Sequence, residues 1–314
     1  MVIEAAPYEA GGKGEWDGFV GGAKNGVFLF RRDYMDYHAD RFPDASLVFR
    51  GEGGRVVALL PATRREDALV SHAGLTFGGI IADSGMKVGL MLEVFDAMAE
   101  RLRSEGVRRL VYKAVPHIYH RVPAEEDLYA LFRHGARLTR RDVSSAVDAR
   151  ARLPFSKGRR YEAKRARREG LEVGRGDDFE TFMRIEEQVL GEKYDTRPVH
   201  TAAELSMLAG RFPDNIKLHV ARRGGETLAG VVVYESECVA HAQYIAAGEE
   251  GKRLGALDLV LEHLINVEYA GKRYFDFGIS TEDAGRRLNA GLAENKQGFG
   301  ARAVVYDFYE MEIN

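Results

Sequence analysis

Residues 274–302, YFDFGISTEDAGRRLNAGLAENKQGFGAR, combine a strand, a turn, a helix and the start of a second strand. Alternation of side chains over 274–279 predicts the first strand, because successive strand residues face opposite sides. Apolar and amide side chains recur at helical spacing over 288–295, and Gly298 and Gly300 end that predicted helix. This order of elements favours a mixed α/β fold.

The same segment brings an amide, a cation and several glycines into one strand-turn-helix unit. Bare backbone positions beside a cation can hold an anion or a polarised carbonyl. We therefore predict that Lys296 stabilises a reacting carbonyl or a phosphate, and the alternative is an exposed lysine at a helix end. Asn289 and Ser280 are predicted to contact the substrate. Their alternatives are a turn anchored by Asn289 and a helix cap formed by Ser280.

The composition excludes several classes of protein. The 314 residues suffice for two domains, and 45% hydrophobic with 30% charged residues is ordinary for a globular protein. A net charge of −3 gives no overall attraction to DNA or anionic lipid. The single cysteine excludes an internal disulfide framework, and we predict no metal site. Neither a signal peptide nor a run of about 20 apolar residues occurs, so we expect a cytoplasmic protein without a transmembrane segment.

Two halves of the chain repeat one plan. Arg41-Phe42-Pro43-Asp44 returns 170 residues later as Arg211-Phe212-Pro213-Asp214, and both copies precede a predicted β-hairpin around paired glycines. A Gly-Ala-Arg motif recurs after 165 residues, and His72 and His241 lie 169 residues apart. The matching positions of these two histidines favour a structural role for both. The common order and near-constant spacing of the matches favour a duplicated fold.

We therefore predict two α/β modules, each a mixed twisted sheet flanked by helices. The first covers residues 1–152 and the second covers residues 153–314, with the boundary near Pro154, where the charge pattern changes. In each module the predicted order is helix, hairpin, strand, helix, strand, helix, strand.

A dense block of positive charge follows the boundary. Seven of the twelve residues from Lys157 to Arg168 are Lys or Arg. One interpretation is the solvated face of a helix, and the other is a helix that faces phosphate groups. In the second interpretation Arg159, Arg160 and Lys164 bind substrate.

Other polar side chains are candidates for substrate contact. Tyr194 and Arg197 lie in a long polar loop, and Lys113 and Tyr119 follow a predicted strand, where α/β folds place ligands. Tyr244 lies on a strand before a glycine-led helix. It lines either the donor channel or the core.

The repeated α/β plan resembles a tandem pair of GNAT (acyl-CoA N-acyltransferase) modules. Within that superfamily KGRRYEAKRARREGLEV, residues 157–173, and the segment 274–302 resemble the FemAB-like branch. That branch includes peptidoglycan-bridge aminoacyltransferases and acetyltransferase-like proteins of envelope-polysaccharide gene clusters. The resemblance covers nearly the whole chain and is strongest over residues 155–302. It implies acyl transfer to an amine, with most of the active site in the second module.

The resemblance also implies a donor site. The GNAT pyrophosphate loop has a glycine three residues after an Arg or Gln, and Lys252 and Gly255 keep this spacing, although Leu257 replaces a small residue. We expect Gly251, Lys252 and Gly255 to bind acyl-CoA as a co-substrate, with no permanently bound cofactor. The helical arm of some tRNA-using bridge enzymes is missing, so tRNA is a disfavoured partner.

Aminolysis of a thioester needs an uncharged amine, a positioned carbonyl and a stabilised oxyanion. Besides Lys296, we name Glu282 as a catalytic candidate, and the general base is left open between Glu282, Asp276, a water relay and the acceptor's own chemistry. We predict transfer of an acyl group to an amine of a cell-envelope sugar or peptide precursor, either a small molecule or lipid-linked. A catalytically silent module that binds a sugar nucleotide or a carrier is the alternative.

Overall fold

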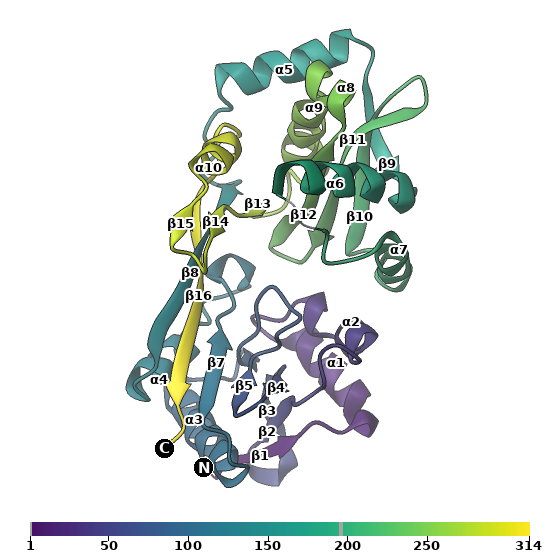
Figure 1. The fold of residues 1–314 in the computed structure, drawn as a ribbon. Helices are drawn as coiled ribbons and strands as arrows, with labels where there is room; N and C mark the ends of the chain where they lie inside the picture. Colours follow the sequence, from purple (N-terminus) through teal and green to yellow (C-terminus); the bar gives the residue numbers. More distant parts are fainter. Residues whose placement is uncertain (1, 195–196) are drawn as a thin grey trace. The chain divides into compact units, whose positions relative to one another are not determined.

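The computed structural model describes residues 2–194 and 197–314, and its chain divides into two compact units (Figure 1). Unit 1 contains the residues up to Asp142 together with Thr281–Arg287 and Val305–Asn314. Unit 2 contains Val143–Ser280 and Leu288–Val304. The chain thus changes unit four times along its length, whereas the predicted modules divide it once, between residues 152 and 153.

Unit 1 contains two sets of strands. The four-stranded sheet has the order β1-β2-β3-β6, formed by Glu4–Pro7, Leu47–Arg50, Val56–Leu60 and Ile81–Ala82. The other set has the order β4-β5-β7-β16, formed by Thr63–Arg65, Ala68–Val70, Arg109–Lys113 and Arg302–Glu312. Helices α1 to α4 are Lys13–Gly22, Arg32–Met35, Val88–Ser104 and Glu126–Arg133. The antiparallel pairing of β2 with β3 confirms the predicted hairpin.

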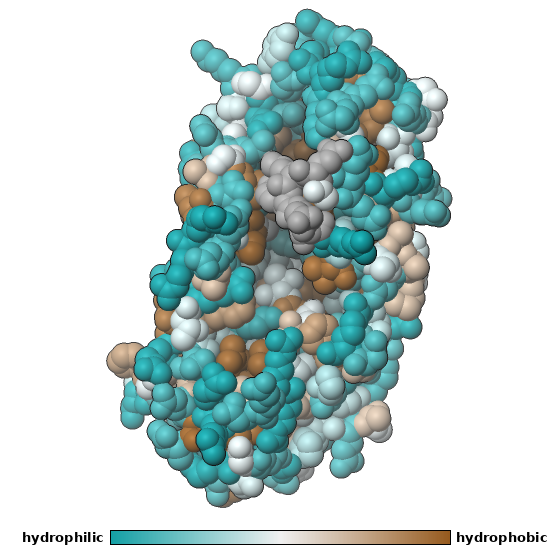
Figure 2. Space-filling view, in the orientation of Figure 1, coloured by the Kyte–Doolittle hydropathy of each residue, from teal (hydrophilic) through white to brown (hydrophobic). Residues whose placement is uncertain are grey.

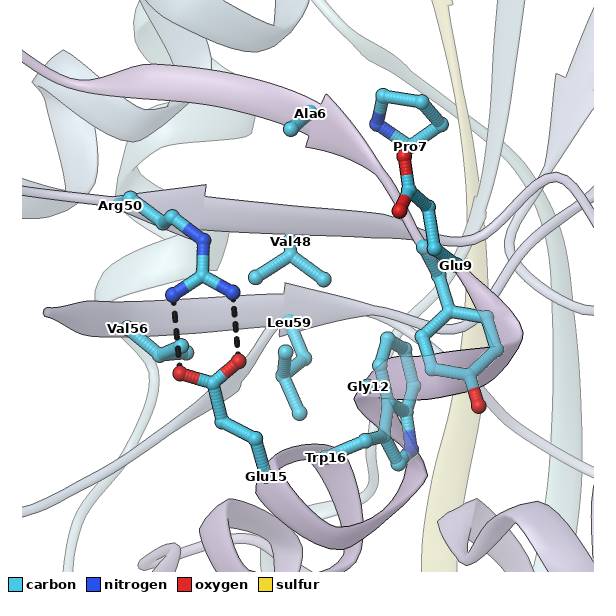
Figure 3. Close-up of a pocket in the computed structure, with 11 residues that line it drawn as sticks. Ala6, Pro7, Glu9, Gly12, Glu15, Trp16, Val48, Arg50, Val56 and Leu59 are labelled. Atoms are coloured by element: carbon cyan, nitrogen blue, oxygen red, sulfur yellow. Dashed lines mark hydrogen bonds and ion pairs between the residues drawn. The ribbon is translucent and has the colours of Figure 1, made fainter. Parts of the chain in front are cut away.

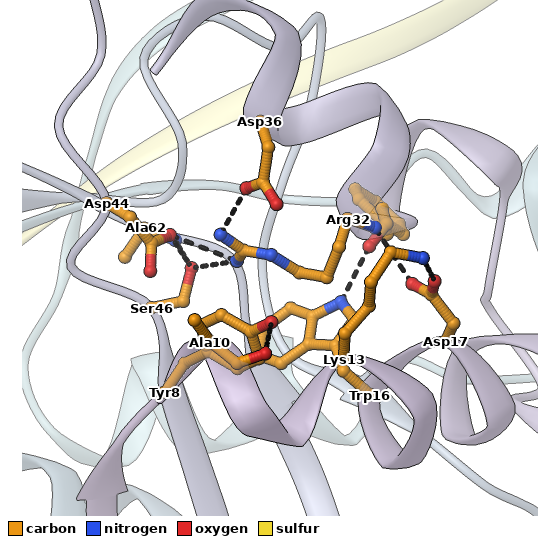
Figure 4. A network of polar contacts seen from close by, with 11 residues as sticks. Tyr8, Ala10, Lys13, Trp16, Asp17, Arg32, Asp36, Asp44, Ser46 and Ala62 are labelled. Atoms are coloured by element: carbon orange, nitrogen blue, oxygen red, sulfur yellow. Dashed lines mark hydrogen bonds and ion pairs between the residues drawn. The ribbon is translucent and has the colours of Figure 1, made fainter. Parts of the chain in front are cut away.

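A buried arginine joins the helical start of unit 1 to its small sheet. The Arg32 guanidinium pairs with Asp36 and, at 3.1 Å, with Asp44 (Figure 4). It also lies 4.0 Å from the centroid of the Tyr8 ring. Because two carboxylates and an aromatic face surround the guanidinium, its buried charge is compensated, and the cluster is structural.

Unit 2 is built on a longer run of strands. Their order is β8-β13-β12-β11-β10-β9, formed by Arg137–Asp148, Tyr274–Ile279, Val239–Ala247, Glu226–Glu235, Ile216–Arg223 and Glu172–Gly176. Helices α5 to α10 are Lys157–Arg168, Phe179–Tyr194, Ala202–Arg211, Glu249–Leu254, Ala256–His263 and Ala290–Gln297. The helix predicted from Gly251 is divided at Gly255, whose φ of +72° starts a new helix. Two-residue strands β14 and β15, Thr281–Glu282 and Arg287–Leu288, pair with each other.

The two faces of the unit 2 sheet have different character. Val231, Val233, Phe275 and Phe277 pack with α5, α8 and α9 in one hydrophobic core. On the other face α6 crosses the strands, as Figure 1 shows, and the Phe182 ring lies where a side chain at Gly230 would point. Because strand residues alternate between faces, Asp276 lies on the α6 face, between Phe275 and Phe277.

The last strand of each repeat completes the other unit. β8 follows α4 in the sequence but pairs in unit 2 with β13, with Asp148 opposite Tyr274. β16 follows α10 but pairs in unit 1 with β7, with Phe308 opposite Lys113. The predicted tandem α/β plan is confirmed. The exchange of closing strands depends on long-range pairing, which the sequence pattern does not specify. Among the described residues, no helix combines the length and apolar character needed to cross a bilayer.

Candidate active site

The parallel strands β12 and β13 pair over only three residues. Val239 lies opposite Tyr274, Ala240 opposite Phe275 and His241 opposite Asp276. Beyond this point β12 continues beside β11 as far as Ala247, while β13 bends at Gly278, which has a φ of +75°. The two strands therefore separate directly after His241 and Asp276. Polar side chains at this position lie where the pairing between β12 and β13 ends.

A buried carboxylate lies at the point of separation. Asp276 is fully shielded from solvent, and one of its oxygens accepts a hydrogen bond from the Ser144 hydroxyl. Its other oxygen lies 2.7 Å from Nδ1 of His241. Because two donors hold the carboxylate, its buried charge is compensated. The arrangement fixes the orientation of the His241 imidazole.

Lys296 reaches the same segment from α10. The side chain is 6% exposed, and its ammonium donates to the carbonyls of Gly278 at 2.8 Å and of Ile279 at 2.7 Å. Burial lowers the pKa of Lys296 to about 8, against a smaller opposing effect of the Asp276 charge. An ammonium has three N–H donors, so one donor is left after these two bonds among the described residues. The alternative of an exposed lysine at a helix end is wrong.

Ser280 and Asn289 have different roles in this segment. Asn289 caps α10, because its side-chain oxygen accepts the amide N–H of Leu292 at 3.1 Å. This confirms the interpretation of Asn289 as an anchor of the turn. Ser280 caps no helix, and its buried hydroxyl has no partner in the described part of the chain. The interpretation of Ser280 as a helix cap is therefore wrong.

Helix α6 contributes a second buried carboxyl group. Glu186 is 6% exposed, and its Oε2 atom lacks a hydrogen-bond partner within residues 2–194 and 197–314. Burial raises the pKa of this carboxyl group to about 7. Glu186 lies one turn after Phe182, on the side of α6 that packs against the sheet. A carboxyl group with this pKa can exchange a proton near neutral pH.

Unit 1 has no matching acid and histidine. The β5 and β7 pair is also parallel, and Val70 and Val111 occupy the register position that His241 and Asp276 occupy in unit 2. His72 lies two residues beyond Val70 and outside β5, with a φ of +37°, whereas His241 lies within β12, so only His241 is on a strand. Small differences in strand length between the copies hide this difference in the sequence.

Lys113 is placed in unit 1. Its buried ammonium donates to the carbonyls of His72, at 2.9 Å, and of Leu75. Burial lowers the pKa of Lys113 to about 7, assisted by the Arg140 charge. Tyr119, also in unit 1, is buried, and its hydroxyl lies 3.2 Å from that of Tyr306. These two predicted substrate residues therefore lie in the interior of unit 1.

The predicted donor residues lie at the junction of α8 and α9. A side chain at Gly251 would meet the Leu228 carbonyl at 2.2 Å, and one at Gly255 would meet the Glu162 carbonyl at 2.8 Å. Both glycines are therefore required by close packing against β11 and α5. The Lys252 ammonium pairs with Glu249 at 2.6 Å. Packing alone explains both glycines, and a role in donor binding stays a prediction.

Helix α5 divides its cations between two faces. Arg159 pairs with Asp258 at 2.9 Å and borders a surface pocket of about 660 Å³ between α5 and α10. Arg160 and Lys164 are exposed and make no ion pair among the described residues. Figure 2 shows a hydrophilic surface where α5 lies in Figure 1. The exposed cations are available to an anionic ligand.

The remaining predicted residues are dispersed. Glu282 belongs to unit 1, where it pairs with Arg287 at 2.5 Å. The Tyr244 hydroxyl lies 2.6 Å from Nδ1 of His200, within unit 2. Arg197 is exposed, and the side chain of Tyr194 falls outside the described residues.

Unit 1 also has a pocket of its own, of about 270 Å³. Glu15 and Arg50 form a forked ion pair there, with N–O distances of 2.5 and 2.9 Å (Figure 3). Hydrogen bonding to Arg50 lowers the pKa of Glu15. Because the two charges neutralise each other, neither Glu15 nor Arg50 offers an unpaired charge to this pocket. Across the described ranges, no three His, Cys, Asp or Glu side chains gather as metal ligands.

Comparison with known families assigns the second half of the chain. Residues 157–284 match the family model described as an acetyltransferase (GNAT) domain. This part of the chain therefore resembles a GNAT domain. The match begins at α5 and includes His241, Asp276 and the bend at Gly278. No curated protein matches the sequence.

Several solved structures share the fold over nearly the whole chain. FemX aligns with a TM-score of 0.68 at 12% identity, covering 97% of this chain and 96% of FemX. L-PGS from Bacillus licheniformis aligns with a TM-score of 0.60 at 13% identity, covering 90% and 92%. A conserved protein of unknown function from Bacteroides thetaiotaomicron gives 0.63 at 11% identity, covering 96% and 97%. The chain therefore shares the fold of these proteins over nearly its whole length.

Glu186 was not named from the sequence, and His241 was named there only for a structural role. Glu186 follows Phe182 by four residues, so the two side chains lie on the same side of the helix. An acidic residue on the predicted buried side of a helix is the sequence signal that could have identified Glu186. His241 required the register of β12 against β13, because its partner lies 35 residues away. That register follows from packing rather than from a local pattern.

The raised pKa of Glu186 predicts a pH-dependent stability. The folded state holds this proton more tightly, so the free energy of unfolding should fall as pH rises from about 4.5 to about 7 and then level off. The shift corresponds to about 3 kcal/mol. In Glu186→Gln this fall should be missing when unfolding by denaturant is measured across that range. Glu187→Gln, at the exposed next position, should behave like the wild type. Parallel pH curves for the wild type and Glu186→Gln would contradict the assignment.

Proposed function

We propose that the protein is an N-acyltransferase that transfers an acyl group from an acyl-CoA thioester to an amine of a cell-envelope precursor. The observation that carries the proposal is the buried Lys296 ammonium, which donates to the carbonyls of Gly278 and Ile279 at the end of β13. Gly278 and Ile279 lie in the segment that matches the GNAT domain model, and Lys296 follows that segment in the sequence. Two of its N–H groups are committed to main-chain carbonyls, which hold the charge in a fixed position. A fixed cation in a partly dry site is suited to a developing oxyanion.

The reaction requires little beyond position and electrostatics. The amine nitrogen attacks the thioester carbonyl, the N–C bond forms and the C–S bond breaks. The attacking amine loses a proton, and the leaving thiolate of the donor takes up a proton to give the free thiol. In this proposal the remaining N–H of Lys296 donates to the carbonyl oxygen as negative charge develops on it. The unpartnered hydroxyl of Ser280, adjacent to Ile279, is a second candidate donor.

The donor is proposed to be an acyl-CoA rather than an aminoacyl-tRNA. The net charge of the chain is −3, which favours a small donor over a long polyanion. We propose that the pyrophosphate lies near Lys252 and that Arg160 and Lys164 of α5 contact donor or acceptor phosphates. The amine acceptor, either a small molecule or lipid-linked, follows from the resemblance to the FemAB-like branch. Stabilisation by a sugar nucleotide without any product would favour a silent binding module instead.

Replacing Lys296 by Met should lower kcat by more than tenfold, and by up to about 10³-fold, because one oxyanion donor is lost. The measurement is turnover with a panel of acyl-CoA donors and amine acceptors, with thermal unfolding to check the fold. Lys272→Met is the matched control, because Lys272 also donates to main-chain carbonyls in unit 2, those of Ser236 and Glu237. Wild-type turnover in Lys296→Met would refute the role.

The wild type and Lys296→Met should differ in how kcat depends on pH. Lys296 is protonated below its pKa of about 8 and loses its charge above it. The ratio of wild-type kcat to Lys296→Met kcat should therefore be largest below pH 8 and decline above it. Taking the ratio removes the titration of the acceptor amine, which both proteins share. A ratio that rises above pH 8 would instead make the neutral lysine the active form.

Salt dependence tests the donor. For an acyl-CoA, the apparent affinity should fall less than about tenfold between about 50 and 200 mM salt, and a tRNA donor should lose more because several counterions are released.

Arg160→Gln with Lys164→Gln should raise the KM of the donor at least about threefold through lost phosphate contacts. Arg133→Gln with Arg137→Gln, two exposed positions in unit 1, removes the same charge and should leave the KM unchanged. An equal effect of both pairs would exclude a specific contact.

A further inference from the structure

The pairing of His241 with Asp276 determines which imidazole nitrogen carries a proton. Both oxygens of Asp276 accept hydrogen bonds, one from the Ser144 hydroxyl and one from Nδ1 of His241. Because a carboxylate offers only acceptors, Nδ1 must be the protonated nitrogen of a neutral ring. Nε2 then carries the lone pair, on the side of the ring that points away from Asp276. The dyad thus presents a base with a defined direction.

The His241 ring is less completely buried than its partner. The His241 side chain is 11% exposed, although its partner Asp276 is fully buried. A side chain at position 278 would approach Cε1 of His241 to 3.4 Å, and Gly278 supplies none. The absence of a side chain at Gly278 therefore leaves the space beside Cε1 of His241 open. The main chain at 278 also accepts the Lys296 ammonium, which places the cation and the imidazole beside the same residue.

Unit 1 provides an internal comparison. In the same register of its parallel pair, Val70 and Val111 take the places of His241 and Asp276. Two valines therefore satisfy this position of the fold. The parallel pair of unit 1 forms without a polar pair at this point, and burying a polar pair costs more than burying two apolar side chains.

We propose that His241 is the general base of the transfer reaction and that Asp276, supported by Ser144, is its positioning residue. This inference rests on the proposed acyltransferase function. Nε2 of His241 accepts the proton of the attacking amine as the N–C bond forms and the C–S bond breaks. The resulting imidazolium is stabilised by the Asp276 carboxylate and returns the proton to the leaving thiolate. Neither an oxidant nor a further reactant is needed.

Other titratable groups border the same face of the sheet. Tyr234 of β11 lies opposite His241 in register, Glu186 lies on α6, and Lys296 approaches from α10. Glu186 is the competing candidate for the base, because its carboxyl group is also buried. The hydrogen bond to Asp276 distinguishes His241 from it, since Glu186 has no bonded partner for Oε2 among the described residues.

The test is turnover of His241→Ala with and without added imidazole. We expect kcat to fall about 10²- to 10⁴-fold, with the KM of the donor changed less than about threefold, and imidazole to restore part of the loss. His219→Ala is the matched control. His219 is also buried in unit 2 and bonded to Tyr269, but it lies on β10, opposite Val231 of the α9 core. It should change kcat little and should not respond to imidazole.

Asp276→Asn tests the positioning role. It should lower kcat without rescue by imidazole, and ¹⁵N spectra should show His241 changing from the Nδ1–H to the Nε2–H tautomer. His241→Gln, measured by thermal unfolding and turnover, guards against a folding defect in the alanine variant. Wild-type kcat in a folded His241 variant would overturn the proposal, as would a spectrum with the proton on Nε2 in the wild type. Loss of all turnover in Glu186→Gln, with turnover retained in His241→Ala, would assign the base to Glu186.

The same experiment separates this inference from the function on which it rests. If the wild type transfers no acyl group from any donor to any amine, the proposed function fails, and the role of His241 fails with it. If the wild type is active and the His241 variants match it, only the role of His241 fails.

Discussion

A carboxylate without access to water must be surrounded by hydrogen-bond donors, and Asp276 imposes this requirement on the centre of unit 2. Its donors come from β12 and β8, so the requirement binds three strands together at one point. Lys296 donates to the carbonyls of Gly278 and Ile279, which follow Asp276 in β13, and against the lowering by burial the Asp276 charge raises the pKa of Lys296. The polar interior of unit 2 is thus one connected arrangement.

The two copies of the fold show what duplication keeps and what it changes. Both have a parallel pair of strands after a hairpin, and both use a buried lysine, Lys113 or Lys296, to bind main-chain carbonyls. Among the described residues, unit 2 places a histidine and a carboxylate where its parallel strands separate, and unit 1 has two valines at the end of its parallel pair. Strand β8, from the first repeat of the sequence, pairs with β13 in unit 2, and β16, from the second repeat, pairs with β7 in unit 1. We infer that unit 2 carries the chemistry and that unit 1 has kept the fold without this dyad.

Local sequence patterns predicted much of the fold. The alternation over 274–279, the hairpins and the helix before Gly298 are all found, because each depends on neighbours within a few residues. The importance of Lys296 was predicted from its charge beside glycines, but its burial depends on tertiary packing. The His241–Asp276 contact depends on the register of two distant strands, and the repeat spacing does not show that His241 lies within a strand and His72 outside one. Gly251 and Gly255 match a loop pattern, yet their closest contacts are backbone atoms of β11 and α5.

The central claim is that acyl transfer takes place at the end of β13 in unit 2. The most direct measurement is a crystal structure with an acyl-CoA analogue in which a methylene group replaces the sulfur, so that the carbonyl is kept but transfer is blocked. We predict that the carbonyl oxygen lies about 3 Å from Nζ of Lys296, at hydrogen-bond distance. A well-ordered analogue whose carbonyl binds elsewhere, with Lys296 bonded only to Gly278 and Ile279, would contradict the claim.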